Sequence, residues 1–242
     1  EEVNAKDFFE SIQRAYDSHG TRGIILKINS PGGSPVQAGM INDEIRRQKK
    51  IHPHIPVYAV VEDICASGGY YIAVATDKIY VDKASIVGSI GVLMDGFGFT
   101  DTMKKVGVER RLMTAGSNKA MLDPFLPINP KQQAFVQDML NQVHQQFIAV
   151  VREGRGQRLK ESPEMFSGLF WNGETAVKLG LADGMANYDF VARELIKADD
   201  IVDFTTYEGF ADRFARKFGA SVGAAMQSSI RQQLSQNGIK LH

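Results

Sequence analysis

Short apolar runs alternate with helical patterns through the first half of the chain. Residues 23–29 and 56–61 are runs of the length of a buried strand, and each leads into glycines and then into a stretch with helical character. Residues 35–50 are the clearest such stretch, because the apolar residues from Val36 to Ile45 fall on one helical face. Strands that alternate with helices predict an α/β fold, with a mainly parallel sheet covered by helices on both faces.

The rest of the chain carries further strand and helix patterns. Strands are expected at residues 78–81, 85–87, 91–94, 110–113 and 201–205. Helices are expected at residues 8–16, 70–76, 99–106, 130–150, 171–180, 188–198 and 207–226. The second half of the chain is therefore expected to be mostly helical.

Charge and cysteine content exclude several classes of protein. The 242 residues include 28 Lys and Arg against 28 Asp and Glu, so the chain lacks the field of a protein that wraps nucleic acid or coats an anionic membrane. Cys65 is the one cysteine, which excludes an intrachain disulfide and a cysteine-based zinc site, and no HExxH motif supports a metal. No uncharged stretch reaches the ~18 residues of a membrane span. The chain opens on Glu1, which indicates a processed form or one without its natural N-terminus.

Three glycine-rich spots interrupt the α/β half, each at the end of an expected strand, at residues 30–33, 66–69 and 88–91. Glycine permits positive φ and lets a ligand approach the backbone, and free N–H groups beside a helix start can hold a negative oxygen. Tight turns alone would also explain any one of these spots. None of them fits a nucleotide motif, since both GxGxxG and GxxxxGK[ST] are missing from the sequence.

Ser67 is the most informative residue of these spots. It lies between an expected strand and an expected helix, with Gly68 and Gly69 directly after it. This is the physical situation of a nucleophile elbow, although the GxSxG pattern is absent. The Gly68 N–H would face the oxygen of a tetrahedral intermediate, and Gly32 or Gly33 would supply a second donor.

A serine nucleophile needs a base, and the histidines offer none in a suggestive place. His19 follows an expected helix, and His52 and His54 lie in a charged linker. His144 sits within a long expected helix, and His242 ends the chain. Lysine is the other base that serine enzymes use, and it must be neutral although its ordinary pKa is ~10.4. Lys119 is the best placed, because residues 112–122 carry no other charge. An ordinary loop lysine remains the alternative, and Asp123 counts against Lys119, since contact with a carboxylate raises the pKa of a lysine.

Several ordered motifs resemble the signal peptide peptidase A family. They are NSPGG at 29–33, ASGGYYIA at 66–73, ATDKI at 75–79, IVGSIGV at 86–92, AGSNK at 115–119, WNG at 171–173 and GLAD at 180–183. The resemblance implies a Clp protease and crotonase type of fold, built from repeated β-β-α units. It implies a peptidase domain at residues 1–186 and a helical extension at residues 187–242, packed on that domain or on a neighbouring subunit.

The resemblance also implies a site. Ser67 would be the nucleophile, Lys119 the base and Ser89 the serine that hydrogen-bonds the lysine. Gly33 and Gly68 would form the oxyanion hole, while Gly32 and Gly69 would contact the substrate. No cofactor and no metal is implied.

The implied activity is that of a serine endopeptidase with a Ser-Lys dyad, which degrades residual signal peptides and other apolar peptides bound as an added strand. The implied assembly is a ring-like homo-oligomer whose neighbouring subunits share sites, with no nucleic-acid partner. The implied location is the bacterial inner membrane, with an N-terminal anchor absent from this chain and the catalytic domain on the periplasmic side.

Two other functions stay open on the sequence. A crotonase-type acyl-CoA enzyme would hold a thioester enolate with the same N–H groups, and Glu62 or Asp63 would be its base. A non-catalytic scaffold for membrane quality control is the other, and the presence of both Ser67 and Lys119 argues against it.

Overall fold

The structure is a computed structural model that describes residues 5–206. The chain divides into two compact units, Glu1–Asp203 and Phe204–His242. Every described helix and strand lies in the first unit. Residues 187–203 of the expected extension belong to that unit too, whereas the helix expected at residues 207–226 lies outside the described residues. The domain division at residue 186 stays a prediction.

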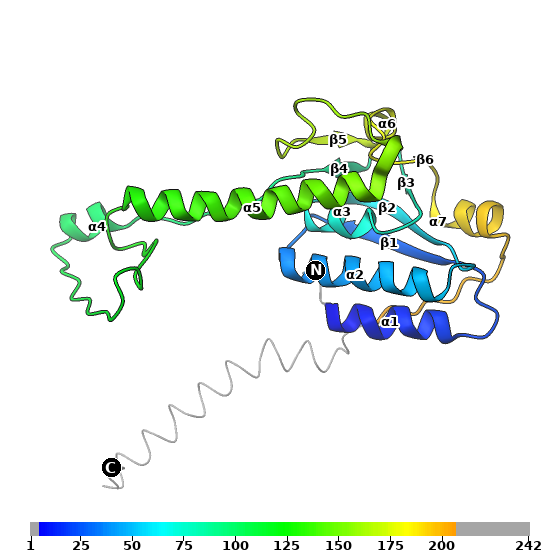
Figure 1. Ribbon diagram of the computed structural model, residues 1–242, viewed down its shortest axis with the longest axis horizontal. Coiled ribbons are helices and arrows are strands. Elements are labelled where there is room, and N and C mark those ends of the chain that lie inside the picture. The colour runs from blue at the N-terminus through cyan, green and yellow to red at the C-terminus, as the bar shows by residue number, and fades with distance from the viewer. Residues whose placement is uncertain (1–4, 207–242) are drawn as a thin grey trace, which may run out of the picture. The chain divides into compact units, whose positions relative to one another are not determined.

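Six strands form one sheet around the second strand (Figure 1). They are β1 (Ile24–Ser30), β2 (Val57–Ala66), β3 (Lys78–Val81), β4 (Ile86–Gly88), β5 (Phe170–Asn172) and β6 (Gly184–Met185). Strand β1 runs parallel along one side of β2, from the pair Ile24 and Val57 to the pair Ser30 and Cys65. On the other side, β3 and β4 pair in parallel with successive parts of β2. The β3–β6 pair is parallel and the β4–β5 pair antiparallel, so the expected α/β class with a mainly parallel sheet is confirmed.

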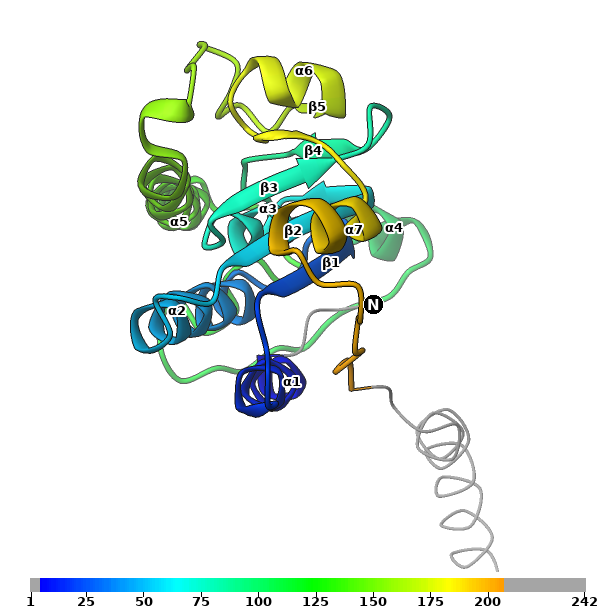
Figure 2. The same ribbon diagram turned by 90° about the vertical axis from the view of Figure 1, so that its right-hand side faces the viewer.

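Helices cover both faces of this sheet. They are α1 (Ala5–Asp17), α2 (Pro35–Ile51), α3 (Gly68–Ala73), α4 (Thr100–Lys105), α5 (Pro130–Arg155), α6 (Gly173–Lys178) and α7 (Tyr188–Phe190). A 3₁₀ turn, Gly156–Arg158, follows α5, and a π-helical turn, Val191–Ile196, follows α7. Figure 2 shows α2 and α5 on one side of the sheet and α7 on the other.

Alternation along β2 explains this layering. Ala59 and Val61 point into the main core, which also contains Phe147 from α5. Val60 points to the opposite face and packs with Val191, the first residue of the π-helical turn after α7. Successive side chains of a strand face opposite sides of its sheet, so a continuous apolar run is what a strand buried on both faces requires.

Some expected strands are absent. Residues 91–94, 110–113 and 201–205 form no strand, and the stretch expected as a helix at 171–180 begins instead with β5. The physical reason is exposure in the first two cases, since Leu93 is 80% exposed and Met113 is 96% exposed, and neither pairs with a described strand. An apolar run forms a strand only where it can pair with a neighbouring strand and bury its side chains.

Helix α5 joins this body to a projecting segment. Its buried residues lie mainly toward its C-terminus and include Phe147, Ile148 and Val151. Its N-terminal half runs out from the sheet and meets residues 92–129, which we call the arm (Figure 1). The arm contains α4 and many exposed apolar side chains, among them Leu93, Phe97, Val106, Met113 and Ile128.

Residues 5–206 contain neither a membrane-spanning helix nor a cluster of metal-binding side chains. No helix in this part of the chain has both the length and the apolar character needed to cross a bilayer. Nor do three or more His, Cys, Asp or Glu side chains converge there in a way that could hold a metal ion.

Candidate active site

Ser67 occupies a sharp corner between β2 and α3. Its backbone has φ of 50° and ψ of −121°, a combination that residues with a side chain adopt only when the surroundings impose it. Two hydrogen bonds hold that backbone: the Ser67 N–H donates to the Gly88 carbonyl at 2.9 Å, and the Ser67 carbonyl accepts from Tyr71 N–H at 2.9 Å. The corner is therefore fixed from β4 on one side and from α3 on the other.

The loop after β1 approaches this corner backbone to backbone. Gly32 has φ of 116°, and a Cβ placed on it would lie 2.8 Å from the Ser67 Cβ, closer than real side chains come. A Cβ on Gly68 would lie 3.3 Å from the Gly33 nitrogen, and one on Gly69 would lie 3.0 Å from the Ser30 carbonyl oxygen. Larger residues at these positions would push the loop away from the serine.

Two backbone N–H groups, those of Gly33 and Gly68, lie where the loop after β1 meets the start of α3. Gly68 is the first residue of α3, so its N–H has no acceptor within the helix. The Gly33 nitrogen lies next to it across the loop contact. N–H groups in such a pair can stabilise an oxyanion, provided that the oxygen lies about 3 Å from both.

A cavity of about 560 Å³ opens at the serine. Four of the expected site residues line it, namely Ser67, Gly68, Gly33 and Ser89. The other lining residues are mostly apolar or small: Pro31, Pro35, Ala38, Tyr71, Gly91, Val92, Leu93, Val143, Gln146, Phe147, Ser167 and Gly168. The cavity therefore suits an extended chain with apolar or small side chains better than a charged ligand.

Ser89 is held as firmly as Ser67. Its φ is 52°, and its N–H donates to the Leu169 carbonyl, which precedes β5, at 2.7 Å. The next residue, Ile90, accepts a contact of 3.1 Å from the His144 ring nitrogen of α5. Ser89 thus faces the same cavity as Ser67 from the end of β4.

Lys119 does not reach this cavity in one chain. Its N–H bonds to the Gly116 carbonyl at 3.1 Å, its side chain is exposed, and it is absent from the cavity lining. The preceding residue, Asn118, accepts a hydrogen bond of 3.0 Å from Gln132 in the first turn of α5. A helix rises 1.5 Å per residue, so Gln132 stands about 16 Å along α5 from the cavity-lining Val143.

Asp123, which counted against Lys119, is engaged elsewhere. It pairs with Arg110, and it accepts a hydrogen bond of 2.9 Å from the Phe125 N–H. The hydrogen bond from Arg110 is the main reason that the pKa of the Asp123 carboxyl is lowered. The objection drawn from its sequence position therefore loses its force.

The acidic pair of the acyl-CoA alternative is also engaged elsewhere. Glu62 forms an ion pair with Lys27 at 3.0 Å, and Asp63 accepts a hydrogen bond of 2.9 Å from Asn29. Neither carboxylate lines the cavity.

Sequence reasoning missed the wall that α5 gives to the cavity. Val143 and Phe147 line it one helical turn apart, and the Phe147 ring lies 5.1 Å from the Tyr71 ring. The signal was the apolar stripe along residues 130–150, which indicated packing but not what the stripe would face.

A comparison with protein families decides the affiliation of the chain. The model of Peptidase family S49 matches residues 49–202, which is more than half of the chain and includes Ser67, Ser89 and Lys119. The chain belongs to peptidase family S49. The resemblance to a peptidase family that was drawn from the sequence motifs is thereby confirmed.

Individual curated proteins match over most of this chain. The protein named putative signal peptide peptidase SppA, from Enterococcus faecium, is 28% identical over 208 residues, 86% of this chain and 60% of that protein. The protein named Na(+)/H(+) antiporter NhaA, from Brucella melitensis, is 46% identical over 176 residues, 73% of this chain and 24% of that protein. The chain thus spans less than two thirds of either relative.

Solved structures also match this S49 chain. Among them is a ClpP1 mutant from Listeria monocytogenes, 16% identical, with a TM-score of 0.47; the match covers 77% of this chain and 87% of that chain.

Proposed function

We propose that this S49 chain is a serine endopeptidase whose nucleophile is Ser67. The observation that carries the proposal is the placement of Ser67 at a strained corner, at the mouth of an apolar cavity and beside the N–H groups of Gly33 and Gly68. Acyl transfer needs these three parts together: a nucleophile, a place for the oxyanion, and a groove that orients the substrate.

In the proposed reaction Ser67 Oγ attacks the scissile carbonyl and passes its proton to neutral Lys119. The oxyanion of the tetrahedral intermediate accepts hydrogen bonds from the Gly33 and Gly68 N–H groups. Collapse expels the amine, which takes the proton from Lys119. Water then hydrolyses the acyl-enzyme by the same route. Ser89, on the same cavity, would orient the lysine.

Lys119 would come from a neighbouring subunit. The single chain holds it beside the N-terminal end of α5, within the arm, whose exposed apolar side chains a second copy would cover. A lysine acts as a base in its neutral form, which burial favours. Contact between the arm of one subunit and the cavity of the next would remove water from Lys119 and complete the site. A closed homo-oligomer, such as a ring, repeats that contact for every subunit.

The proposed substrates are extended peptides with apolar or small side chains, such as residual signal peptides. The cavity walls support this class, since they contribute Tyr71, Phe147, Val143 and Leu93 and no charged side chain. A location at the bacterial inner membrane, with the site on the periplasmic side, remains a prediction.

The test is hydrolysis of a fluorogenic apolar peptide by Ser67→Ala and Lys119→Ala. Each variant should lose about 1,000-fold or more in kcat while its oligomeric state stays unchanged, because each removes a group that takes part in bond breaking. The matched controls are Ser117→Ala and Lys105→Ala, exposed residues of the arm that should retain activity. A fluorophosphonate adduct mapped to Ser67 by mass spectrometry would identify the nucleophile directly. Normal turnover in either Ser67→Ala or Lys119→Ala would exclude the dyad.

A further inference from the structure

Helix α3 carries Ser67 at its start but is too short to fix its own position. It has six residues, and its N-cap Ser67 makes no side-chain capping bond. Short helices draw their stability from the surrounding packing rather than from their own hydrogen bonds. The placement of Ser67 and the Gly68 N–H therefore depends on what anchors α3 further along.

Tyr70 provides such an anchor. It is fully buried in the main core, three residues after Ser67, and its hydroxyl donates a hydrogen bond of 2.8 Å to the Leu181 carbonyl. Burial raises the pKa of Tyr70, so the hydroxyl stays protonated and can donate at any physiological pH. This bond joins α3 to a segment more than 100 positions later in the sequence.

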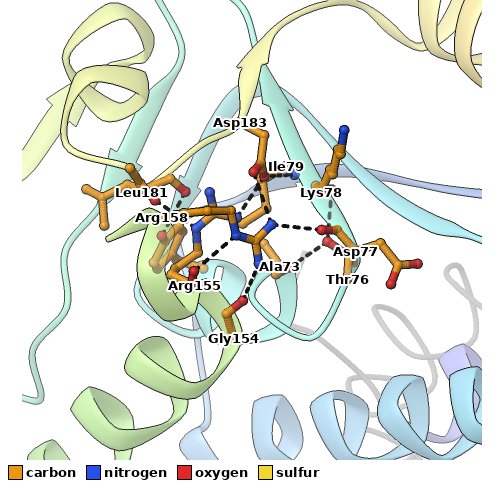
Figure 3. A network of polar contacts seen from close by, with 12 residues as sticks. Ala73, Thr76, Asp77, Lys78, Ile79, Gly154, Arg155, Arg158, Leu181 and Asp183 are labelled. Atoms are coloured by element: carbon orange, nitrogen blue, oxygen red, sulfur yellow. Dashed lines mark hydrogen bonds and ion pairs between the residues drawn. The ribbon is translucent and has the colours of Figure 1, made fainter. Parts of the chain in front are cut away.

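The segment that accepts this bond is itself clamped. Arg155, the last residue of α5, donates from Nε to the Gly180 carbonyl and from Nη1 to Asp183 Oδ2, both at 2.8 Å. Arg158 donates to the other oxygen of Asp183 at 3.0 Å, and the Ile79 N–H of β3 donates to Oδ2 at 2.7 Å. Figure 3 shows Asp183 beside both arginines, with Leu181 close by.

This clamp connects the two walls of the cavity. Helix α5 contributes Val143 and Phe147 to the cavity and ends in Arg155, which is 2% exposed. Helix α3 contributes Gly68 and Tyr71 to the same cavity and is held to the clamp by Tyr70. Both helices are therefore hydrogen-bonded to the same segment, Gly180 to Asp183.

We propose that Tyr70 is a positioning residue for the reaction. Its hydrogen bond to the Leu181 carbonyl fixes the position of α3. It thereby fixes the positions of Ser67 Oγ and the Gly68 N–H relative to Gly33. This inference rests on the proposed peptidase function. Tyr70 does not line the cavity, so it acts through α3 and not on the substrate. Its loss should lower the rate of the chemical step and leave substrate binding nearly unchanged.

The test compares Tyr70→Phe with the control Tyr80→Phe in the full chain. Both changes remove one hydroxyl from a buried tyrosine, but Tyr80 lies in the core on the other face of the sheet. Active sites are first counted with a fluorophosphonate, so that unfolded protein does not enter the rate. Tyr70→Phe should lower kcat about 10- to 100-fold with KM within about twofold of the original, because small misplacements of reacting groups cost that much. Tyr80→Phe should keep both constants.

The outcomes separate this inference from the function that it rests on. An inactive parent chain, or an active Ser67→Ala variant in the same assay, would overturn the peptidase function and the role of Tyr70 with it. An active parent chain, an inactive Ser67→Ala and an unchanged kcat in Tyr70→Phe would overturn the role of Tyr70 alone. So would a fall in kcat of equal size in Tyr80→Phe.

A second variant covers the case in which Tyr70→Phe does not fold. Arg158→Gln loosens Asp183 from the solvent side, where the Arg158 side chain is 41% exposed, and so leaves the core closed. Its kcat should fall about two- to fivefold at constant KM, since the clamp is weakened but not broken. If Tyr70→Phe cannot be studied, an unchanged kcat in Arg158→Gln overturns the proposal.

Discussion

Ser67 combines strain and close contact in a way that leaves little freedom at its position. Its backbone conformation costs of the order of 1–3 kcal/mol and persists only where neighbours enforce it. Those neighbours are Gly88, which accepts its N–H, and the loop at Gly32, which lies against its Cβ. The geometry of the proposed nucleophile is therefore set by glycines, which have no side-chain functional groups.

A substitution at Gly32 tests that view. In Gly32→Ala the new methyl group would lie 2.8 Å from the Ser67 Cβ and 2.9 Å from the Gly68 nitrogen. We expect a loss of peptide hydrolysis and a fall of about 1–3 kcal/mol in the free energy of unfolding, measured by urea titration, because both sterics and φ disfavour alanine there. Gly39→Ala is the control, since its Cβ meets nothing within 4 Å, and it should leave activity intact. Full activity in Gly32→Ala would show that the loop can move away at no cost.

Asp183 links single residues to the pH dependence of stability. Burial alone would raise the pKa of its carboxyl, but the hydrogen bond and charge of Arg155, the Ile79 N–H and Arg158 together hold that pKa below its ordinary value. A carboxyl with a lowered folded-state pKa stabilises the fold above its unfolded pKa of ~3.9, and that contribution is lost as the pH falls toward the folded value. The free energy of unfolding should therefore decrease below about pH 4.

Asp183→Asn should remove part of that acid dependence. At pH 7 the variant should lose about 3–5 kcal/mol, because it leaves buried Arg155 without its counter-charge, and its stability should change less between pH 5 and pH 3 (about the titration range of carboxyls). The control is Asp101→Asn, whose exposed ion pair with Lys104 should matter little. Urea unfolding at several pH values measures both; an acid profile equal to that of the parent chain would exclude Asp183 as a source of the effect.

At the scale of elements, the two halves of α5 lie in different structural environments. The C-terminal half belongs to the core and to the cavity wall, whereas the N-terminal half carries the arm. Two phenylalanines on this one helix show the contrast, since Phe147 is 4% exposed and Phe135 is 64% exposed.

The same change at these two positions should have different effects. Phe147→Ala should lower the free energy of unfolding by about 3–5 kcal/mol, because it leaves a void beside Tyr71. Phe135→Ala should change it by no more than about 0.5 kcal/mol when the chains are dilute. Chemical unfolding at low protein concentration measures both values. Similar losses at the two positions would mean that the N-terminal half of α5 is covered in the dilute chain as well.

The elements that the sequence predicts well are those whose partners are local. The strand before Ser30, the glycine turn and the helix from Pro35 follow from an apolar run, positive-φ glycines and a proline in the first helical turn. The strands expected at residues 91–94 and 110–113 were wrong because their apolar residues face solvent in the single chain. Periodicity shows that a side chain seeks burial, but not whether its own chain provides it.

The residues of the candidate site also differ in whether local sequence patterns predict their positions. Ser67, Gly68 and Gly33 could be placed from the strand ends and glycines, and the structure brings them to one cavity. The separation of Lys119 from them could not be read from local patterns, because it follows from the length and direction of α5. The hydrogen bond of Tyr70 could not be predicted either, since its acceptor lies in a segment remote in sequence.

At the scale of the whole molecule, the proposed sharing of the site between subunits can be tested by mixing two variants. Ser67→Ala chains keep Lys119, and Lys119→Ala chains keep Ser67. Mixed oligomers of the two inactive variants should recover part of the activity, at most about a quarter of that of the parent if subunits mix at random and each site uses two chains. Native mass spectrometry verifies the mixing. Verified mixed oligomers without activity would indicate that each site is built from one chain.

The pairing of β2 on both of its sides has a consequence for amide hydrogen exchange. Residues 58–60 pair with β1 on one side and β3 on the other, and Cys65 pairs with β1 and β4, so the N–H groups of these residues have no local route to solvent and should exchange only through global unfolding. Ser67 follows directly at the end of this strand. Within residues 5–206 the slowest-exchanging amides should therefore include one close to the proposed nucleophile. On heating, the reactivity of Ser67 and the sheet should be lost in one step, whereas the amides of the arm should exchange at much lower temperature.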